Sequence, residues 1–429
     1  MSDVKLNLVK DVCDIPFIDM YKNMLECDGA SWVLKFKREA FDRYQKLFNR
    51  KNISSKVYDF ISQNNFSFEM EKVVPALDFL LKYKTFNIEA YTIVLVNGRY
   101  IPEISAEEEL PFSIYSDGLC NCLKDNNEFL KDNLCYGEDV FTLLNSAYLC
   151  DGIVLKVSKG ERLDKPIHII SINTSSDRVL FTSPRVYINI EDGACVDLLE
   201  SSLSLDNDKF FENRVCQVSV GKNANLNHYR LSDNSIASLV MENDFVKCEN
   251  GAKYNLFVAS VKSGILDVRY NLDIQKGAEV NVASSILGKA KSFNNFVANL
   301  FHSGSNALSD VKFYGVADDE SNIEFKTDLK TLRILENIKT NQLSKILLVS
   351  ENSAGSIKPF QTIDSENVNA FHGAVISGVS DKDLFFLQSR GIDVDNAKKI
   401  LCKSFLLTPF SDMKRSQVFD EFVQFYWDN

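Results

Sequence analysis

The 429-residue sequence lacks long hydrophobic runs and a surplus of positive charge, and each absence excludes a class of protein. No run of about 18 apolar residues is free of charges, which argues against a membrane-spanning helix. The opening stretch MSDVKLNLVKDVCDIPF has no apolar segment of the kind found in secretion signals. The net charge of −11 argues against nucleic-acid and anionic membrane partners, which attract clustered Lys and Arg. We therefore expect a cytoplasmic protein.

Motifs for common cofactors are missing as well. Ten cysteines are scattered without any CxxC, and the one CxC (Cys120, Cys122) has no second pair nearby, which argues against a zinc finger. The Gly-Lys pairs in VSVGKNAN and ILGKAKS lack the earlier Gly and the following Ser or Thr of a phosphate-binding loop. Neither G-x-G-x-x-G nor G-x-S-x-G occurs. We expect no catalytic or nucleotide-binding site and no permanently bound cofactor.

What the sequence does contain is a long central region of alternating, Val- and Ile-rich segments, from Gly152 to about Ile363. Segments such as PIHIISI, RVYINI and VCQVSV are typical of strands, and no helical pattern separates them, which disfavours a doubly wound α/β sheet. Turns that contain glycine recur at intervals of 28, 30, 26 and 27 residues, and we expect a left-handed backbone at each glycine: Gly193, Gly221, Gly251, Gly277 and Gly304. This spacing favours the stacked coils of a β-solenoid, with a large β-sandwich as the alternative.

Helical patterns flank the central region. A stripe of apolar residues recurs with helical spacing between Trp32 and Phe48. After the strands, Ser380 is an expected N-cap and Gly391 an expected helix end, with Phe385, Phe386 and Leu387 expected to pack inward. A second helix should end before Pro409, and SQVFDEFVQFYW should form a third. We therefore predict a mostly helical region over 1–150, a β-helix core over 151–365 and a C-terminal helical region over 366–429.

The chain has only four histidines. His168 and His228 lie on alternating strands, where a hydrogen-bonded structural role is expected, and His302 precedes a turn and is left undecided. His372 lies at the expected end of a strand and is followed by Gly373, which would let backbone or a partner approach closely. From its chemistry alone, a structural role for His372 is the default.

The stretch NAFHGAVISGVSDKDLFFLQSRGI resembles the C-terminal signature of the SufD branch of the SufB/SufD family of iron–sulfur cluster assembly scaffolds. The similarity includes His-Gly-Ala, a spacer and a helix that ends in Ser-Arg-Gly-Ile. LNSAYLCDGIVLKVSKGERLDKPIHII and SPRVYINIEDGACVDLLES are similar to the family's entry into its β-helix. The likeness covers about residues 90 to 408 and is dense only from 341. Gly373 favours SufD, because SufB usually has Glu after the histidine.

The resemblance implies a right-handed parallel β-helix between two helical regions, which agrees with the pattern of strands and turns. It implies pairing with a SufB-like subunit through the β-helix and docking of a SufC-like ATPase on the C-terminal helices. A second copy of the chain is an alternative partner. An iron–sulfur cluster or iron would be held transiently at the SufB interface by His372. We expect the ATPase to contact Arg390, Gly391, Ile392 and the face of 394–407.

Two departures from the family pattern weaken the expected cluster site. Ala370 stands where SufD proteins often have Cys, and Thr362 where Glu is common, so only His372 is left as a ligand. A purely structural adaptor without metal contact is therefore one alternative. The other is a β-solenoid enzyme acting on polysaccharide, which would need a cleft of carboxylates and aromatic residues that is not apparent in the sequence.

Overall fold

The structure is a computed structural model of the whole chain, and it describes most of it. The described residues are Phe17, 20–21, 31–48, 53–68, 89–105, 110–125, Leu130, Leu134, 137–174, 178–204, 208–411 and Phe419. The expected third C-terminal helix lies outside these residues except for Phe419. None of the helices in these ranges is long and apolar enough to cross a membrane.

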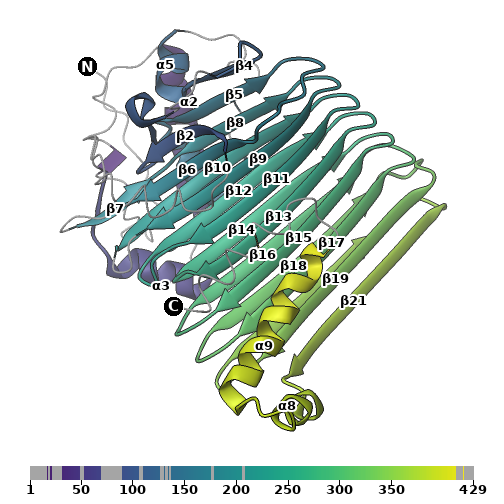
Figure 1. The fold of residues 1–429 in the computed structure, drawn as a ribbon. Coiled ribbons are helices and arrows are strands. Elements are labelled where there is room, and N and C mark those ends of the chain that lie inside the picture. Colours follow the sequence, from purple (N-terminus) through teal and green to yellow (C-terminus); the bar gives the residue numbers. More distant parts are fainter. Residues whose placement is uncertain are drawn as a thin grey trace.

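The central region is a parallel β-solenoid made of two long sheets (Figure 1). Apart from two antiparallel pairs near the N-terminal end, β2 with β3 and β4 with β5, every strand pairs in parallel with a strand of the next coil. The eleven-stranded sheet, called sheet A, contains β1 (Phe66–Ser67), β4 (Ile114–Gly118), β5 (Gly152–Val157), β7 (Val179–Thr182), β8 (Arg185–Ile190), β10 (Phe210–Val220), β12 (Leu239–Cys248), β14 (Ile265–Ile274), β16 (Phe293–His302), β18 (Asn322–Thr331) and β20 (Ala354–Thr362).

The ten-stranded sheet, called sheet B, faces sheet A across the solenoid interior. It contains β2 (Tyr91–Val96), β3 (Arg99–Tyr100), β6 (Ile167–Asn173), β9 (Cys195–Ser204), β11 (Asn225–Asp233), β13 (Lys253–Lys262), β15 (Glu279–Gly288), β17 (Leu308–Ala317), β19 (Ile338–Leu348) and β21 (Val368–Gly378). The β-solenoid prediction is confirmed and the sandwich alternative is wrong. Inward-facing Val, Ile, Leu and Phe of both sheets form one continuous core. β21 lies within the segment 366–429 that was expected to be a helical region.

The turns between coils differ in part from the sequence prediction. Gly193, Gly251 and Gly277 have the expected positive φ angles of 72°, 71° and 68°. At the other two turns the left-handed residue is an asparagine, Asn223 or Asn306, with φ of 55° and 59°. Gly304 is required for a different reason, because a Cβ there would lie 2.1 Å from the backbone nitrogen of Lys276 on the neighbouring coil.

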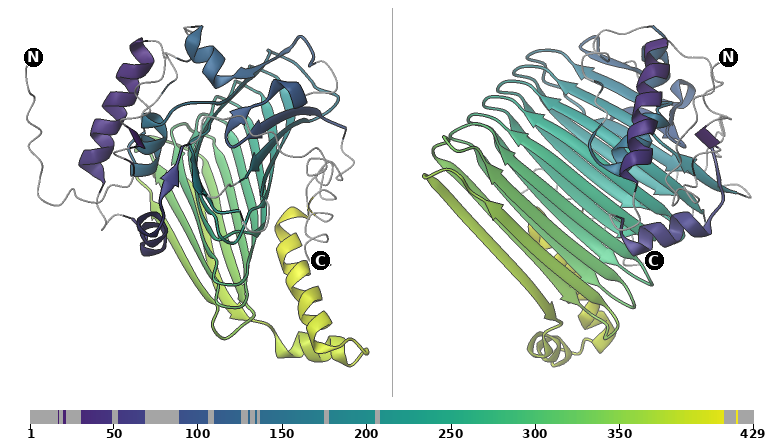
Figure 2. Two further views of the ribbon diagram at one scale, coloured as in Figure 1. Left: turned by 90° about the vertical axis from the view of Figure 1, so that its left-hand side faces the viewer. Right: turned by 180° about the vertical axis from the view of Figure 1, so that it is seen from behind.

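Helices of the N-terminal region pack on one part of sheet A (Figure 2). They are α2 (Ser31–Leu47), α3 (Ser55–Gln63), α5 (Leu119–Lys124) and α7 (Val140–Ala147), with a 3-10 turn at Pro102–Ile104. Apolar residues of α2, α3 and α7 form a second core with Phe181, Phe211 and Met241 of sheet A. Gly152 begins β5, and a Cβ at this position would collide with the carbonyl oxygen of Arg185.

Of the two described C-terminal helices, the second packs on the outer face of sheet B. α8 (Asp381–Gln388) is capped by the Ser380 hydroxyl, which accepts from the Asp383 amide, and α9 (Val394–Leu407) is followed by the 3-10 turn Thr408–Phe410. α9 buries Ala397, Cys402 and Leu406, and the last two pack against sheet B. α8 ends at Gln388, and Gly391, with a φ of 85°, turns the chain just after it. The predicted end of the second helix before Pro409 is confirmed, since α9 ends at Leu407.

The predicted inward packing of α8 is wrong. None of its residues is buried, and Phe385 and Phe386 are 73% and 54% exposed. α8 therefore projects from the solenoid (Figure 1).

Candidate functional site: the open end of the solenoid

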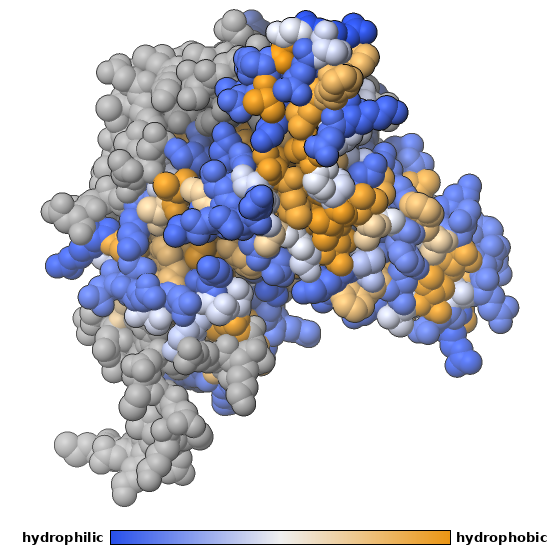
Figure 3. Space-filling view, turned by 90° about the horizontal axis from the view of Figure 1, so that it is seen from below, coloured by the Kyte–Doolittle hydropathy of each residue, from blue (hydrophilic) through white to orange (hydrophobic). Residues whose placement is uncertain are grey.

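The last coil leaves both sheets open at one end of the molecule. Among the described strands, β20 pairs only with β18 and β21 pairs only with β19, so each has a free edge in this part of the chain. Phe360, Phe371, Val375 and Ile376 on these two strands are 49%, 57%, 46% and 44% exposed. Hydrophobic residues lie in patches between hydrophilic ones on the side of the molecule seen from below (Figure 3). Free strand edges with exposed apolar side chains are the features by which sheets recruit another chain.

His372 lies in the middle of β21, not at the end of a strand as predicted. It pairs in register with Gln342 of β19, which is buried. Because paired residues of neighbouring parallel strands point to the same face, the His372 side chain continues an inward-facing row that also contains His228 and Val311. His372 is exposed because β21 is the last strand of sheet B among the described residues, and none of them forms a further coil over it. The imidazole is therefore placed at the mouth of the solenoid interior.

The neighbours of His372 on this end offer no second strong ligand. The next inward-facing residues on β21 are Ala370 and Ala374, and Pro359 of β20 pairs with Thr327, which bonds Gln342 across the interior. Thr362 pairs with Lys330 and so lies on the outer face of sheet A, away from the mouth. In the described part of the chain no group of three His, Cys, Asp or Glu could hold a metal ion. Among these residues, the His372 imidazole is therefore the one side chain that could serve as a strong ligand in a metal site shared with another chain.

Gly373 has a different local role from the one expected. Its Cβ would lie 3.0 Å from Cδ1 of Leu343 and 3.5 Å from the Phe371 ring. The missing side chain thus leaves room for two neighbours of the same chain on the outer face of sheet B.

The second group of predicted residues lies beyond the end of α8. Arg390 stacks on the Phe386 ring with its guanidinium carbon 4.4 Å from the ring centroid. Gly391 turns the chain and Ile392 is half-buried, while Val394 and Ile400 of α9 are 42% and 46% exposed. These residues and the α8 phenylalanines belong to one helical hairpin, called the α8–α9 hairpin. Its α9 packs on the outer face of sheet B, whereas His372 continues an inward-facing row.

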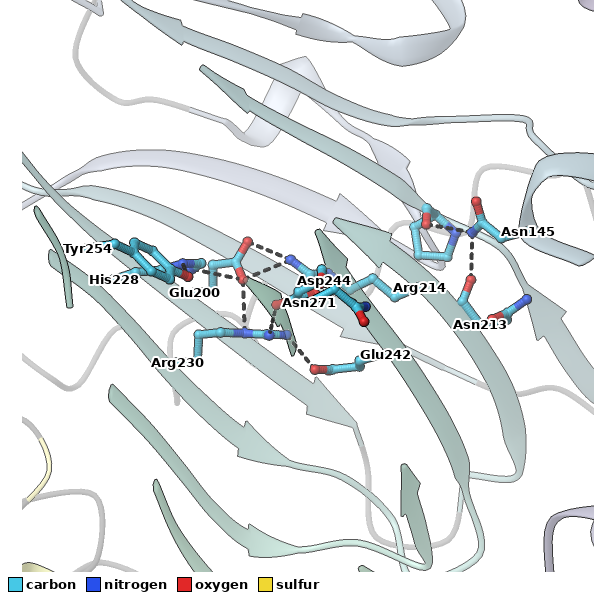
Figure 4. Close-up of polar contacts among 11 residues, drawn as sticks. Asn145, Glu200, Asn213, Arg214, His228, Arg230, Glu242, Asp244, Tyr254 and Asn271 are labelled. Atoms are coloured by element: carbon cyan, nitrogen blue, oxygen red, sulfur yellow. Dashed lines mark hydrogen bonds and ion pairs between the residues drawn. The ribbon is translucent and has the colours of Figure 1, made fainter. Parts of the chain in front are cut away.

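Sequence reasoning missed a cluster of buried charges inside the solenoid (Figure 4). Arg214 of β10 donates two hydrogen bonds of 2.8 Å to the Glu200 carboxylate of β9. Arg230 of β11 contacts Glu200 at 3.1 Å, Glu242 at 2.5 Å and Asp244 at 2.6 Å. All five side chains are at most 9% exposed. The cluster ties sheet A to sheet B across the interior.

The surroundings of this cluster shift the pKa values of its carboxyl groups in opposite directions. Burial by itself would raise the pKa of Glu200, but Arg214, His228 and Arg230 outweigh it and lower the pKa. Burial raises the pKa of Glu212 to about 7, although a hydrogen bond of 2.6 Å from Asn173 opposes the rise. His228 lies between the hydroxyl of Tyr254 at 3.1 Å and Glu200 at 3.2 Å.

The other histidines are structural, as predicted for His168. Burial lowers the pKa of His168 and of His302 to about 4, and their Nε2 atoms lie 2.9 Å from the hydroxyls of Ser201 and Ser309. His228 has the hydrogen-bonded role expected for it, within the buried cluster.

A groove of about 890 Å³ crosses the outer face of sheet A from β8 to β18. Its lining contains the aromatic residues Tyr187, Phe245 and Phe301 together with the carboxylates Asp273 and Asp328. This combination was not apparent in the sequence, because neighbouring members are one or two coils apart along the chain. They meet only when the coils stack.

Two family models match the sequence. The SufBD core domain of the SUF iron–sulfur cluster assembly system matches residues 171–405, and the SufBD N-terminal region matches residues 17–169. The chain belongs to the SufBD family of iron–sulfur cluster assembly proteins. The core model covers the coils from β6 onward, the open end and nearly all of α9. It therefore includes both the strand that carries His372 and the α8–α9 hairpin.

Individual SufBD relatives agree with this assignment. A SufBD-family iron–sulfur cluster assembly protein of Synechocystis is 25% identical over 73% of this chain and 72% of its own length. The chloroplastic protein ABCI7 of Arabidopsis thaliana is 27% identical over 62% of this chain and 58% of its own length. The iron–sulfur cluster assembly protein SufD of Bacillus subtilis is 26% identical over 65% of this chain and 64% of its own length. The chain is thus SufD-like within the family.

Proposed function

We propose that this chain is a non-catalytic, SufD-like subunit of an iron–sulfur cluster scaffold, which pairs through its open end with a SufB-like subunit. The observation that carries the proposal is the free edge of each of β20 and β21 in the described structure, with the exposed His372 of β21 at the mouth of the interior. A partner that caps this end would enclose His372.

At such an interface His372 would act as a ligand for the cluster or iron that is being assembled, which is cargo and not a resident cofactor. A neutral imidazole is a borderline ligand for iron, and thiolates from the partner would have to complete the site. Ala370 and Ala374 beside His372 have no donor atoms, which supports a shared site and not one made by this chain alone.

The docking site for a SufC-like ATPase in this proposal is the projecting hairpin of α8 and α9. Its exposed Phe385 and Phe386, followed by Arg390, form an aromatic and cationic surface of the kind enriched at protein interfaces. We place the contact on α8 as well as on Arg390, Gly391 and Ile392. ATP hydrolysis would then belong to the partner, and a cytoplasmic location for the complex remains a prediction.

Pull-down experiments after co-expression with a SufB-like subunit test the pairing. Phe371→Asp with Ile376→Asp should abolish co-purification, because both side chains would be desolvated at the interface, while the isolated variant should keep its melting temperature. Phe112→Asp is the matched control, since Phe112 is fully exposed next to β4, the strand at the opposite end of sheet A. Normal pairing by the double variant would refute the open end as the interface.

Two alternatives to this proposed function can be tested with the same purified proteins. A structural adaptor would pair normally and yet leave the iron content of the complex independent of His372. The groove on sheet A has the carboxylates and aromatic residues that a solenoid enzyme acting on polysaccharide would need, but family membership favours cluster assembly. Release of sugars from polysaccharides by the purified chain would be needed to revive the enzyme interpretation.

A further inference from the structure

The groove on sheet A has a regular construction that ends at the open end of the solenoid. Two rows of outward side chains cross its strands in register, one starting at Tyr187 and the other at Asn189. The first row reaches Asp328 and continues to Phe360, and the second reaches Lys330 and continues to Thr362. Phe360 and Thr362 belong to the edge strand β20. The groove therefore opens at the rim where the proposed partner would sit.

The chemistry along the groove suits a peptide better than a uniformly charged or purely apolar ligand. Amide side chains form part of its floor, and Asn299 donates to Asn271, which donates to the carbonyl of Asp244. Charges of both signs alternate along the second row, with Lys247 and Lys330 on either side of Asp273. Phe301, between Asp273 and Lys330, is 40% exposed. Amides can bond a peptide backbone, while an exposed ring gives its side chains an apolar contact.

The dimensions of the groove fit a short extended segment. Six strands spaced at about 4.8 Å span about 24 Å, the length of roughly seven extended residues. Among the described helices, α2 and α5 cover only Tyr187 at the first strand of the groove, α7 packs near the first halves of β10 and β12, and α9 lies on sheet B (Figure 2). The end of the groove at the rim is left uncovered by these helices. A chain can therefore reach the groove from the rim.

The area of the open end explains why such a segment would be needed. β20 and β21 have 9 and 11 residues. An end face of two such strands, about 33 Å long and about 20 Å wide with side chains, offers on the order of 700 Å². A standard interface takes about 800 Å² from each partner. The end face alone is at the lower limit, and a peptide lying in the groove would add contact that continues directly from the rim.

We infer that the groove on sheet A binds an extended arm of the subunit that caps the open end. This inference rests on the proposed pairing and adds a second contact to it. The arm would lie across the strands and would carry both polar and apolar side chains. The SufC-like ATPase is not the occupant, because its proposed site, α8 and α9, lies on the opposite sheet.

Photo-crosslinking in the assembled complex tests the arm. With p-benzoylphenylalanine at position 301, cross-links to one short stretch of consecutive residues in the SufB-like partner are expected. The same group at Ile236, an exposed turn residue outside the groove lining, is the control and should give no cross-link to that stretch. Cross-links to the ATPase, to this chain itself or to no protein in an intact complex would overturn the inference.

An affinity measurement separates this inference from the proposed function. Phe301→Asp should weaken pairing about tenfold without abolishing it and without changing the melting temperature, because Phe301 is on the outer face of the sheet. Removal of the cross-linked stretch from the partner should weaken binding to the same degree, and the two changes together should weaken it no further. An unchanged affinity in Phe301→Asp would refute the arm and would not affect the proposed pairing through the end face. Failure of the unaltered chains to pair would refute both the arm and the pairing.

Discussion

Glu212 has a carboxyl group whose protonation should make folding depend on pH. Burial raises its pKa to about 7 in the folded chain, whereas the unfolded chain should release the proton near pH 4.5. The folded state therefore binds more protons between these values, so the stability contributed by Glu212 is present at acid pH and is lost as the pH rises through about 7.

We expect Glu212→Gln to remove this dependence. Between about pH 5.5 and about pH 8, the free energy of unfolding of the unaltered chain should fall by about 2 kcal/mol more than that of the variant. Urea unfolding at the two pH values measures the difference. Equal slopes in both proteins would show that Glu212 ionises normally in the interior.

Arg230 is the residue on which the buried charge cluster depends most. It contacts Glu200, Glu242 and Asp244, so its removal leaves three interior carboxylates with fewer partners. Arg230→Met should lower the free energy of unfolding by about 3–5 kcal/mol, as expected for breaking a buried ion pair on one side. Lys247→Met, on the exposed outer face of β12, is the control and should change stability by less than about 0.5 kcal/mol. A small effect at Arg230 would mean that water or protons already neutralise the cluster.

At the scale of elements, the strands were predictable because each buries one face and so alternates apolar and polar residues over about ten positions. The constant turn spacing then indicated a solenoid. The buried cluster was not predictable, because Glu200, Arg214 and Arg230 are brought together by stacking and by contact between the sheets. The same holds for His372: its pattern identified a strand, but its place at the mouth follows from the register with Gln342.

α8 shows how an apolar pattern can mislead. Phe385 and Phe386 look like core residues in the sequence, yet the helix has only eight residues and projects from sheet B. In the described chain both rings are more than half exposed, although Arg390 stacks on Phe386. Exposed aromatic side chains on a short helix indicate a contact with another chain rather than a core.

Substitution of α8 should separate binding from folding. Phe385→Ser with Phe386→Ser should leave the melting temperature within about 1 °C, since both side chains are already in solvent. Binding of the SufC-like ATPase, measured by calorimetry, should weaken at least about tenfold if each ring contributes roughly 1 kcal/mol or more. Leu406→Ala is the contrasting variant, because Leu406 is buried under α9 and its loss should cost about 2–5 kcal/mol of stability. Unweakened binding by the serine variant would move the ATPase contact elsewhere.

At the scale of the whole molecule, the solenoid separates its proposed contacts. The open end faces along the axis, the α8–α9 hairpin lies on sheet B, and the groove lies on sheet A. A SufB-like subunit and an ATPase could therefore bind at the same time without competing. The solenoid serves as a rigid frame, and the chemistry would take place at a surface that this chain shares with another.

The most direct test of this account is the iron and sulfide content of the co-purified complex with His372→Ala. The matched control is Asn369→Ala, an exposed residue on the outer face of the same strand. We predict that His372→Ala leaves the melting temperature and partner binding unchanged and lowers the iron–sulfur content at least severalfold, while Asn369→Ala has no effect. Equal cluster content in both intact complexes would contradict the account and make His372 a residue of the interface without a role in assembly.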